Sequence, residues 1–409
     1  MTKMTLPLAV LCLLGGLVGA SWTWAAEPYR LGVALGFTGT GKVYSQEGLQ
    51  GIEIAVEEIN GGGGLLGQHP IELFTANTRT RPDIAELVVR DLIDRQEVRA
   101  VIGTYSSAAA LAIKPICREH GVLHIATISN AEDITRLDPS PYTFSVVPNT
   151  YMMAKATALG VSELVEANGW KRYVTIASDY AWGRATQEIQ IEVLKQLAPQ
   201  IELAAAYWPP LGETAFNAFI TAIRSQRPDF VLATIAGLDN EYWLRDVRDY
   251  GLLAEVEMPG SLISVTELIR DAKWLRRGTW ARTRAPFFAH LDVPAMTAFV
   301  ERYRARYDQY PTDWAVMSYD GVMALRQGVE KAGSLDSEVV KDALRGLEIE
   351  TTRGRLYFRP IDNQLSASAY FGRIVDEPKY AFPIYADLVE LEAEAIWRPE
   401  AEILAARGQ

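Results

Sequence analysis

Two serines follow a predicted strand and open a predicted helix, an arrangement that suits the binding of an anion or a carbonyl oxygen. The strand is expected over 99–104, and Ser106 and Ser107 come shortly after it. The first turn of a helix has free backbone N–H groups and the positive end of the helix dipole, so negative charge is stabilised there. The same two residues also suit a plain helix cap. Spacing alone leaves both interpretations open.

Other polar and aromatic side chains also follow predicted strands. Ser129 and Asn130 come after the strand expected over 123–128, where they either contact a ligand or form a turn. Ligands of open parallel sheets bind outside the carboxyl ends of the strands. Aromatic residues that suit the wall of an apolar or aromatic ligand site, although each alone is compatible with packing, are Tyr44, Tyr105, Tyr180 and Trp182.

Three further patterns are rejected as functional signals. GFTGTGK at 36–42 has the spacing of a phosphate-binding loop, but Val43 stands where that motif needs a magnesium-binding Ser or Thr. The histidines form no HExxH or other close ligand set, and Cys117 is the only cysteine beyond the N-terminal segment, so we expect no metal, cofactor or disulfide. No G-x-S-x-G sequence marks an α/β hydrolase. We expect no catalytic residues, with a less recognisable exported hydrolase as an alternative.

The elements that position these residues alternate between short apolar runs and amphipathic helical patterns. Such alternation predicts parallel sheets, so the predicted fold class is α/β with doubly wound parallel sheets. The predicted strands are 30–35, 71–76, 99–104, 123–128, 173–178, 201–207 and 230–235. The predicted helices are 45–60, 82–96, 108–120, 150–168, 182–197, 214–226 and 239–250.

The pattern changes in the last third of the chain. Prolines near residue 145 predict a lobe boundary there, with 142–147 as an extended connector. Beyond Leu275 we expect an extended segment over 278–284, a helical block, strands from Arg355 onward, and an acidic tail made of a strand and a helix. The helical block comprises 293–307, 313–331 and 337–347.

The N-terminus is typical of a cleavable signal peptide. Lys3 is followed by an apolar run over 6–18 and then by small residues, so we assign 1–25 to the signal and predict cleavage after Ala25, with Ala20 as the second choice. About 380 residues would remain, more than one hydrophobic core usually organises, so two lobes are expected. The net charge of −11 disfavours a nucleic-acid partner.

Several segments together resemble the type I periplasmic solute-binding proteins of the branched-chain amino acid and amide ABC-transporter family. The resemblance extends over essentially the whole chain after the predicted signal. The matching segments are the opening turn with Tyr44, AVEEINGGGGLLG at 55–67, VIGTYSSAA at 101–109, SDYAWGR at 178–184, PDFVLATIAG at 228–237 and RDVRDYGL at 245–252.

This resemblance implies two doubly wound lobes joined by a three-crossover hinge, with a small solute held in the cleft between them. It places 27–146 and 286–350 in lobe 1, and 147–285 and 351–409 in lobe 2. Hinge closure would deliver the solute to permease subunits in the inner membrane. The resemblance thus implies a periplasmic, monomeric, noncatalytic protein. A ligand-sensing receptor of a signalling system fits the sequence as well.

The resemblance also assigns roles to single residues. Ser107 matches the family position that contacts the polar head of the ligand, and Asn130 with Ser129 matches a position where Thr is usual. Tyr105 and Tyr180 resemble the amide-binding branch of the family.

Two positions depart from the amino-acid binders. Leu262 stands where those proteins use a Glu for the ligand ammonium, and Ala236 stands where they have a Tyr. Asp179 and Asp239 are the acidic residues available to replace that Glu. Because a buried ammonium without an acidic partner is costly, we expect a carboxyl- or amide-bearing solute with an apolar body, and a zwitterionic amino acid is less favoured.

Overall fold

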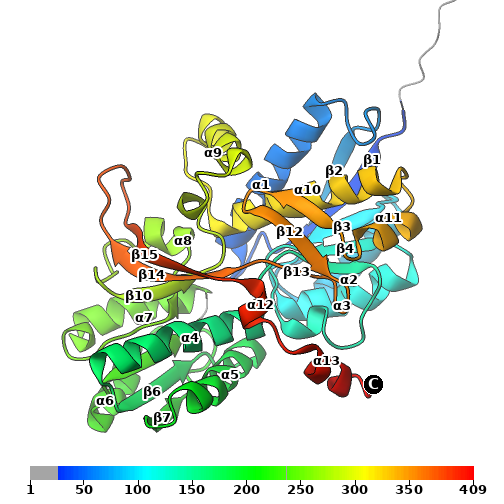
Figure 1. Ribbon diagram of the computed structural model, residues 1–409. Coiled ribbons are helices and arrows are strands. Elements are labelled where there is room, and N and C mark those ends of the chain that lie inside the picture. The colour runs from blue at the N-terminus through cyan, green and yellow to red at the C-terminus, as the bar shows by residue number, and fades with distance from the viewer. Residues whose placement is uncertain (1–25, 236) are drawn as a thin grey trace, which may run out of the picture.

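The computed structural model describes residues 26–235 and 237–409, which form two lobes lying side by side (Figure 1). The predicted signal peptide, residues 1–25, and the candidate residue Ala236 lie outside the described residues. Each lobe has a sheet covered by helices, which confirms the α/β fold class predicted from the alternating pattern. Within the described ranges, no helix combines the length and apolar content needed to cross a bilayer.

An eight-stranded sheet forms the centre of the first lobe, in the order β11-β12-β13-β5-β4-β3-β1-β2. From β2 to β13 the neighbouring strands are parallel, whereas β11 and β12 form an antiparallel edge. The strands are β1 (Tyr29–Leu35), β2 (Ile71–Asn77), β3 (Ala100–Gly103), β4 (Leu123–Ala126), β5 (Thr143–Ser145), β11 (Glu348–Thr351), β12 (Gly354–Arg359) and β13 (Gln364–Leu365).

Helices cover both faces of this sheet because its buried strands are apolar on both sides. In β3, Val101 packs toward α2 and α3, whereas Ile102 packs toward α1 and α10. The helices of the first lobe are α1 (Lys42–Gly61), α2 (Pro82–Asp94), α3 (Ser107–Glu119), α9 (Pro294–Tyr307), α10 (Asp313–Ala332) and α11 (Ser337–Leu344), with short turns η1 (Glu132–Ile134) and η3 (Phe287–Ala289).

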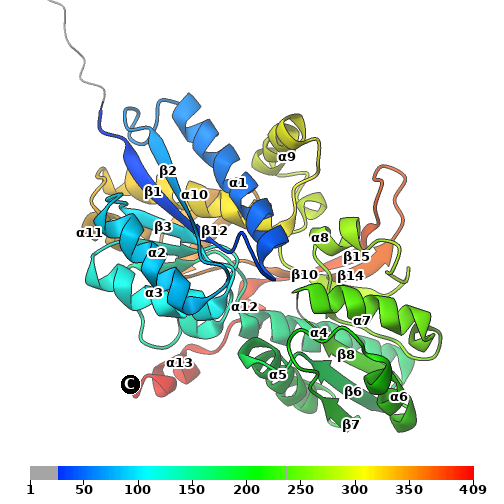
Figure 2. The same ribbon diagram turned by 180° about the vertical axis from the view of Figure 1, so that it is seen from behind.

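Helices α1 and α10 pack closely against each other, as Figure 2 shows from behind. The approach depends on Gly51 in the middle of α1. A Cβ atom at that position would lie 2.1 Å from the carbonyl oxygen of Ala315 on α10. The glycine therefore fixes the helix pair that carries Tyr44 at its first turn and Trp314 on the facing helix.

The second lobe has two sheets. The strands of β7-β6-β8 are parallel, and in β15-β14-β10-β9 only β9 and β10 are parallel. The strands are β6 (Arg172–Ala177), β7 (Glu202–Tyr207), β8 (Phe230–Thr234), β9 (Ser261–Leu262), β10 (Trp280–Thr283), β14 (Ala369–Val375) and β15 (Ile384–Leu391). The helices are α4 (Thr150–Asn168), α5 (Ala181–Leu197), α6 (Asn217–Gln226), α7 (Gly237–Asp249), α8 (Val265–Arg270) and the turn η2 (Leu252–Ala254).

In the described chain up to β14, three connections join the two lobes. They run between β5 and α4, between β10 and α9, and between β13 and β14. The resemblance put the last change of lobe at residue 351, but β12 and β13 follow that residue and pair within the first sheet. We therefore propose that the third crossover begins after Leu365.

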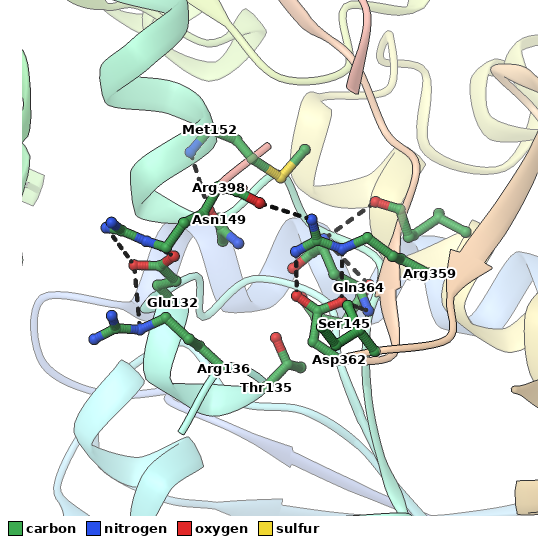
Figure 3. A network of polar contacts seen from close by, with 12 residues as sticks. Glu132, Thr135, Arg136, Ser145, Asn149, Met152, Arg359, Asp362, Gln364 and Arg398 are labelled. Carbon is green, nitrogen blue, oxygen red and sulfur yellow. Dashed lines mark hydrogen bonds and ion pairs between the residues drawn. The ribbon is translucent and has the colours of Figure 1, made fainter. Parts of the chain in front are cut away.

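A C-terminal segment returns from the second lobe to the first across the crossovers (Figure 1). It contains α12 (Ala393–Ile396) and α13 (Glu400–Ala406). Between them, Arg398 donates to both carboxylate oxygens of Glu132, at 2.5 and 3.0 Å, and its carbonyl oxygen accepts from Arg359 at 3.0 Å (Figure 3). Arg407 donates to the carbonyl of Arg136 at 2.7 Å. The segment is thereby attached to the first lobe.

Candidate functional site

The carboxyl end of β3 leads into α3 through a strained turn. Thr104 has a φ of 61°, and Ser106 then forms the N-cap of α3, where its Oγ accepts from the Ala109 N–H at 3.4 Å. The Oγ of Ser107 accepts from the Ala131 N–H at 3.1 Å. Each hydroxyl still has its own proton to donate. Both serines therefore lie at the helix start expected from the sequence, and Ser106 serves as a cap.

Ser129 and Asn130 lie at the end of the neighbouring strand β4. Ser129 and Thr104 share a hydrogen bond between their hydroxyl oxygens at 2.7 Å. The carbonyl oxygen of Asn130 accepts from the backbone N–H and the hydroxyl of Thr150, at 2.8 and 2.9 Å, where the chain enters the second lobe. The Nδ2 of Asn130 is buried and has no hydrogen-bond partner. A buried amide donor is therefore available beside the first crossover.

Aromatic rings gather where the two lobes meet. Tyr44 stacks on Tyr105 with ring centroids 5.6 Å apart and an interplanar angle of 5°, and it meets Trp314 edge-on at 5.3 Å. From the second lobe, the ring of Tyr180 lies 5.9 Å from that of Trp182. A Cβ atom on Gly237, at the start of α7, would lie 3.8 Å from the Tyr105 hydroxyl. Rings from both lobes therefore border one region.

The tyrosine hydroxyls of this region are buried. Burial, followed by the charge of Glu267, raises the pKa of Tyr105 to about 12. Burial, followed by Tyr105 and Asp239, holds the pKa of Tyr180 well above its usual value. At neutral pH both hydroxyls keep their protons and serve as hydrogen-bond donors to a partner.

The two aspartates considered as replacements for the missing Glu already have partners. Asp179 pairs with Arg184 at 2.6 Å, and the Oδ2 of Asp239 accepts from the Gly212 N–H at 2.7 Å. Leu262 packs in an apolar cluster with residues of α4, β14 and α12. The structure thus places Tyr44, Tyr105 and Tyr180 together, whereas Leu262 contacts a core cluster.

Glu267 is an acidic residue of this region that the sequence reasoning missed. It lies in the first turn of α8, where its Oε2 accepts from the Ser264 N–H at 2.8 Å and from the Ser264 hydroxyl. Its Oε1 accepts from the Tyr44 hydroxyl at 2.9 Å, which joins the lobes. The sequence carries a signal for it, because SVTE at 264–267 has the pattern of a capping box.

Arg284 is the second residue of this region that the sequence analysis does not identify. It follows β10 directly, and its side chain is only 3% exposed. Its Cζ lies 4.9 Å from the centre of the Trp314 ring, and its Nε and Nη1 have no hydrogen-bond partner. Burial lowers the pKa of Arg284 to about 10, so the guanidinium stays charged at neutral pH. The available signal was its position just after a strand, which is the criterion that identified the candidates after the other strands.

No group of three His, Cys, Asp or Glu side chains suited to a metal ion occurs in the parts of the chain at 26–235 and 237–409. The residues gathered at the site are aromatic rings, hydroxyl and amide donors, the acidic Glu267 and the basic Arg284.

Residues 28–379 match the family described as "Periplasmic binding protein". The chain belongs to this family. A relative, the Leu/Ile/Val-binding protein homolog 7 of Brucella suis biovar 1 (strain 1330), is 23% identical over 367 residues, which cover 86% of this chain and 88% of that protein. The resemblance to leucine-binding-type proteins inferred from the sequence is thereby confirmed.

Solved structures of periplasmic binding proteins share the fold. An amino acid ABC transporter substrate-binding protein from Pseudomonas fluorescens Pf-5 has a TM-score of 0.81 at 21% identity, covering 93% of this chain and 98% of that chain. A solute-binding protein of an ABC transporter from Rhodopseudomonas palustris BisB5, in complex with 3,4-dihydroxybenzoic acid, has a TM-score of 0.79 at 20% identity, covering 91% and 99%. The two-lobe architecture predicted from the sequence is therefore confirmed.

The family match ends at residue 379, before β15 and the C-terminal segment. The contacts of Arg398 and Arg407 with the first lobe thus lie outside the part of the chain that the periplasmic binding protein family defines.

Proposed function

We propose that this protein is the extracytoplasmic solute-binding component of an ABC transporter. It binds one small carboxylate- or amide-bearing solute between its lobes and passes it, chemically unchanged, to permease subunits of the inner membrane. In this proposal the N-terminal signal is cleaved and the mature protein acts as a periplasmic monomer. Family membership supports this general class. The two solved structures named above are a substrate-binding protein and a solute-binding protein of ABC transporters.

One observation supports a solute site between the lobes. Tyrosines from both lobes border a single region, and the Tyr44–Glu267 hydrogen bond links the lobes at 2.9 Å. Rings that supply apolar surface, together with a few fixed donors, are the usual make-up of a small-molecule site. A solute that contacts both lobes stabilises the closed arrangement, because only that arrangement offers it every contact.

A thermal-shift screen of the mature protein tests this proposal. The panel contains branched-chain amino acids, aromatic acids, short amides and urea, and a solute that binds the folded state raises the melting temperature by mass action. The bound solute is then recovered and analysed by mass spectrometry. Chemical conversion of the solute, or binding restricted to sugars or metal ions, would contradict the proposal.

The Ser107→Ala variant tests the assigned polar contact. Loss of a hydroxyl that bonds a charged solute group costs about 1.5 to 3 kcal/mol, which is a loss of about ten- to hundredfold in affinity. Ser334→Ala is the control, because its hydroxyl serves a turn ahead of α11 in the first lobe. Unchanged affinity in Ser107→Ala would remove this residue from the site.

A further inference from the structure

Arg284 is a buried cation whose side chain lacks the acceptors that other buried arginines have. Arg353 donates to Asp320 at 2.9 Å, and Arg282 donates to the Gly260 carbonyl at 2.6 Å. Arg359 likewise pairs with Asp362, with its Nε at 2.9 Å. For Arg284, two of the three guanidinium nitrogens are buried without a partner, and the described residues provide no ion pair. A buried charge without acceptors is costly unless a ligand supplies them.

The nearest carboxylates are occupied by other donors. The Oδ1 of Asp313 accepts from the backbone N–H groups of Arg284 and Ala285, at 3.0 and 2.9 Å, and its Oδ2 accepts from the Val265 N–H at 2.8 Å. Glu267 accepts from Tyr44 and Ser264. Asp313 and Glu267 therefore interact electrostatically with Arg284 and make no hydrogen bond to its guanidinium.

The surroundings of Arg284 include both lobes. Its charge acts on Tyr105 from the first lobe and on Tyr180 from the second, and its guanidinium lies over Trp314. A solute enclosed by these rings would meet one unpaired cation. The nearby acids already accept bonds from other residues, Asp179 from Arg184, Asp239 from the Gly212 N–H and Glu267 from Tyr44, so a positively charged group on the solute would have to share an acid with these donors.

We propose that Arg284 is the counter-ion of the solute, and that the solute is a small carboxylate without an amino group, with an aromatic or branched apolar body. A guanidinium offers parallel N–H groups that match both oxygens of a carboxylate. A zwitterionic amino acid would bury an ammonium whose acidic partners already accept bonds from other residues, a cost that the free acid avoids. This inference rests on the proposed function and narrows its solute class.

Matched pairs of probes test the inference by calorimetric titration of the mature protein. Benzoate is compared with benzamide, 3-phenylpropanoate with phenylalanine, and 4-methylpentanoate with leucine. Each pair keeps the apolar body and changes only the charge or the amine. We expect the free acid of at least one pair to bind about tenfold or more tightly than its partner. Tighter binding of leucine, phenylalanine or benzamide than of the matched acid would overturn the inference while leaving the proposed function intact.

The Arg284→Gln variant tests the residue itself. We expect a loss of about ten- to hundredfold in affinity for the acid, with the affinity for benzamide nearly unchanged. Arg284→Lys should retain part of the preference for the acid, because it restores the charge without the fork of donors. Arg276→Gln is the control, since that arginine is partly exposed and pairs with Glu257 at 2.9 Å.

The outcomes separate the two proposals. Acid binding that is unchanged in Arg284→Gln would overturn the role of this residue and leave the transport function standing. If that variant does not fold, the preference of the unaltered protein within the probe pairs decides the solute class. Absence of binding to every probe and every panel solute would count against the proposed function and the inference together.

Discussion

The hydrogen bond from Tyr44 to Glu267 predicts that a single hydroxyl stabilises the closed arrangement of the lobes. The bond joins α1 of the first lobe to α8 of the second at 2.9 Å, and Glu267 is buried. In an open arrangement water would solvate both groups. Tyr44→Phe therefore leaves a carboxylate oxygen without its partner only in the closed arrangement, at a cost of about 1 to 3 kcal/mol.

Because solute binding requires closure in the proposed function, this cost should appear as weaker binding. The affinity for the tightest solute of the thermal-shift panel should fall about five- to hundredfold in Tyr44→Phe. In the proposed hinge motion the solute-free lobes are apart and the bond is absent, so the melting temperature of the solute-free protein should change little. Calorimetric titration and differential scanning fluorimetry measure the two quantities.

Tyr319→Phe is the matched control. The Tyr319 hydroxyl donates to Glu58 at 2.6 Å, and both residues belong to helices of the first lobe. This variant should lower the melting temperature and leave the affinity unchanged, which is the opposite pattern. If Tyr44→Phe instead lowers the melting temperature and binds the solute normally, the bond serves folding and the reasoning about closure is wrong.

Three further predictions concern pH, packing and the C-terminal segment. Burial raises the pKa of Glu47 to about 8 from its usual 4.5, so the stability that this group contributes is fully present below pH 4.5 and is lost as the pH rises through 8. Glu47→Gln should therefore raise the melting temperature more at pH 8 than at pH 5; an equal gain at both would contradict this. Gly51→Ala should destabilise the protein by about 1 to 3 kcal/mol through its clash with α10, whereas Gly61→Ala, in the same helix with nothing within 4 Å, should stabilise it slightly; denaturant unfolding of both variants distinguishes them. Arg398→Met should lower the free energy of unfolding by about 1 to 3 kcal/mol, because Glu132 loses two hydrogen bonds, and an unchanged urea midpoint would argue against that attachment.

Much of the fold follows from local sequence patterns. The helix predicted over 150–168 is α4 with the same bounds, and the seven predicted strands lie within two residues of β1, β2, β3, β4, β6, β7 and β8. Apolar periodicity and glycine stops act over a few residues, so a sequence reports them directly. The antiparallel edges formed by β11 with β12 and β14 with β15 depend on pairing across the sheet, which the strand-rich composition does not specify.

The site was less predictable because its contacts join residues that lie far apart in the sequence. Ser107 and Tyr105 are found by their place after a strand. Glu267 gains its role from Tyr44, which lies 223 residues earlier. The burial of Arg284 depends on helix α10 and on both lobes. The sequence around Arg284, next to the second crossover, has no local pattern that distinguishes a buried, unpaired arginine from an exposed one.

The C-terminal segment decides where a reporter of lobe rotation can be attached. Tyr29 begins β1 in the first sheet, and Arg407 is bonded to Arg136 of the same lobe, so both ends of the described chain lie on one lobe. Fluorescent domains fused to the two ends would move together, and energy transfer between them would stay constant during rotation. A responsive sensor needs one dye in the second lobe, for which the exposed turn at Gly169 between α4 and β6 is suitable.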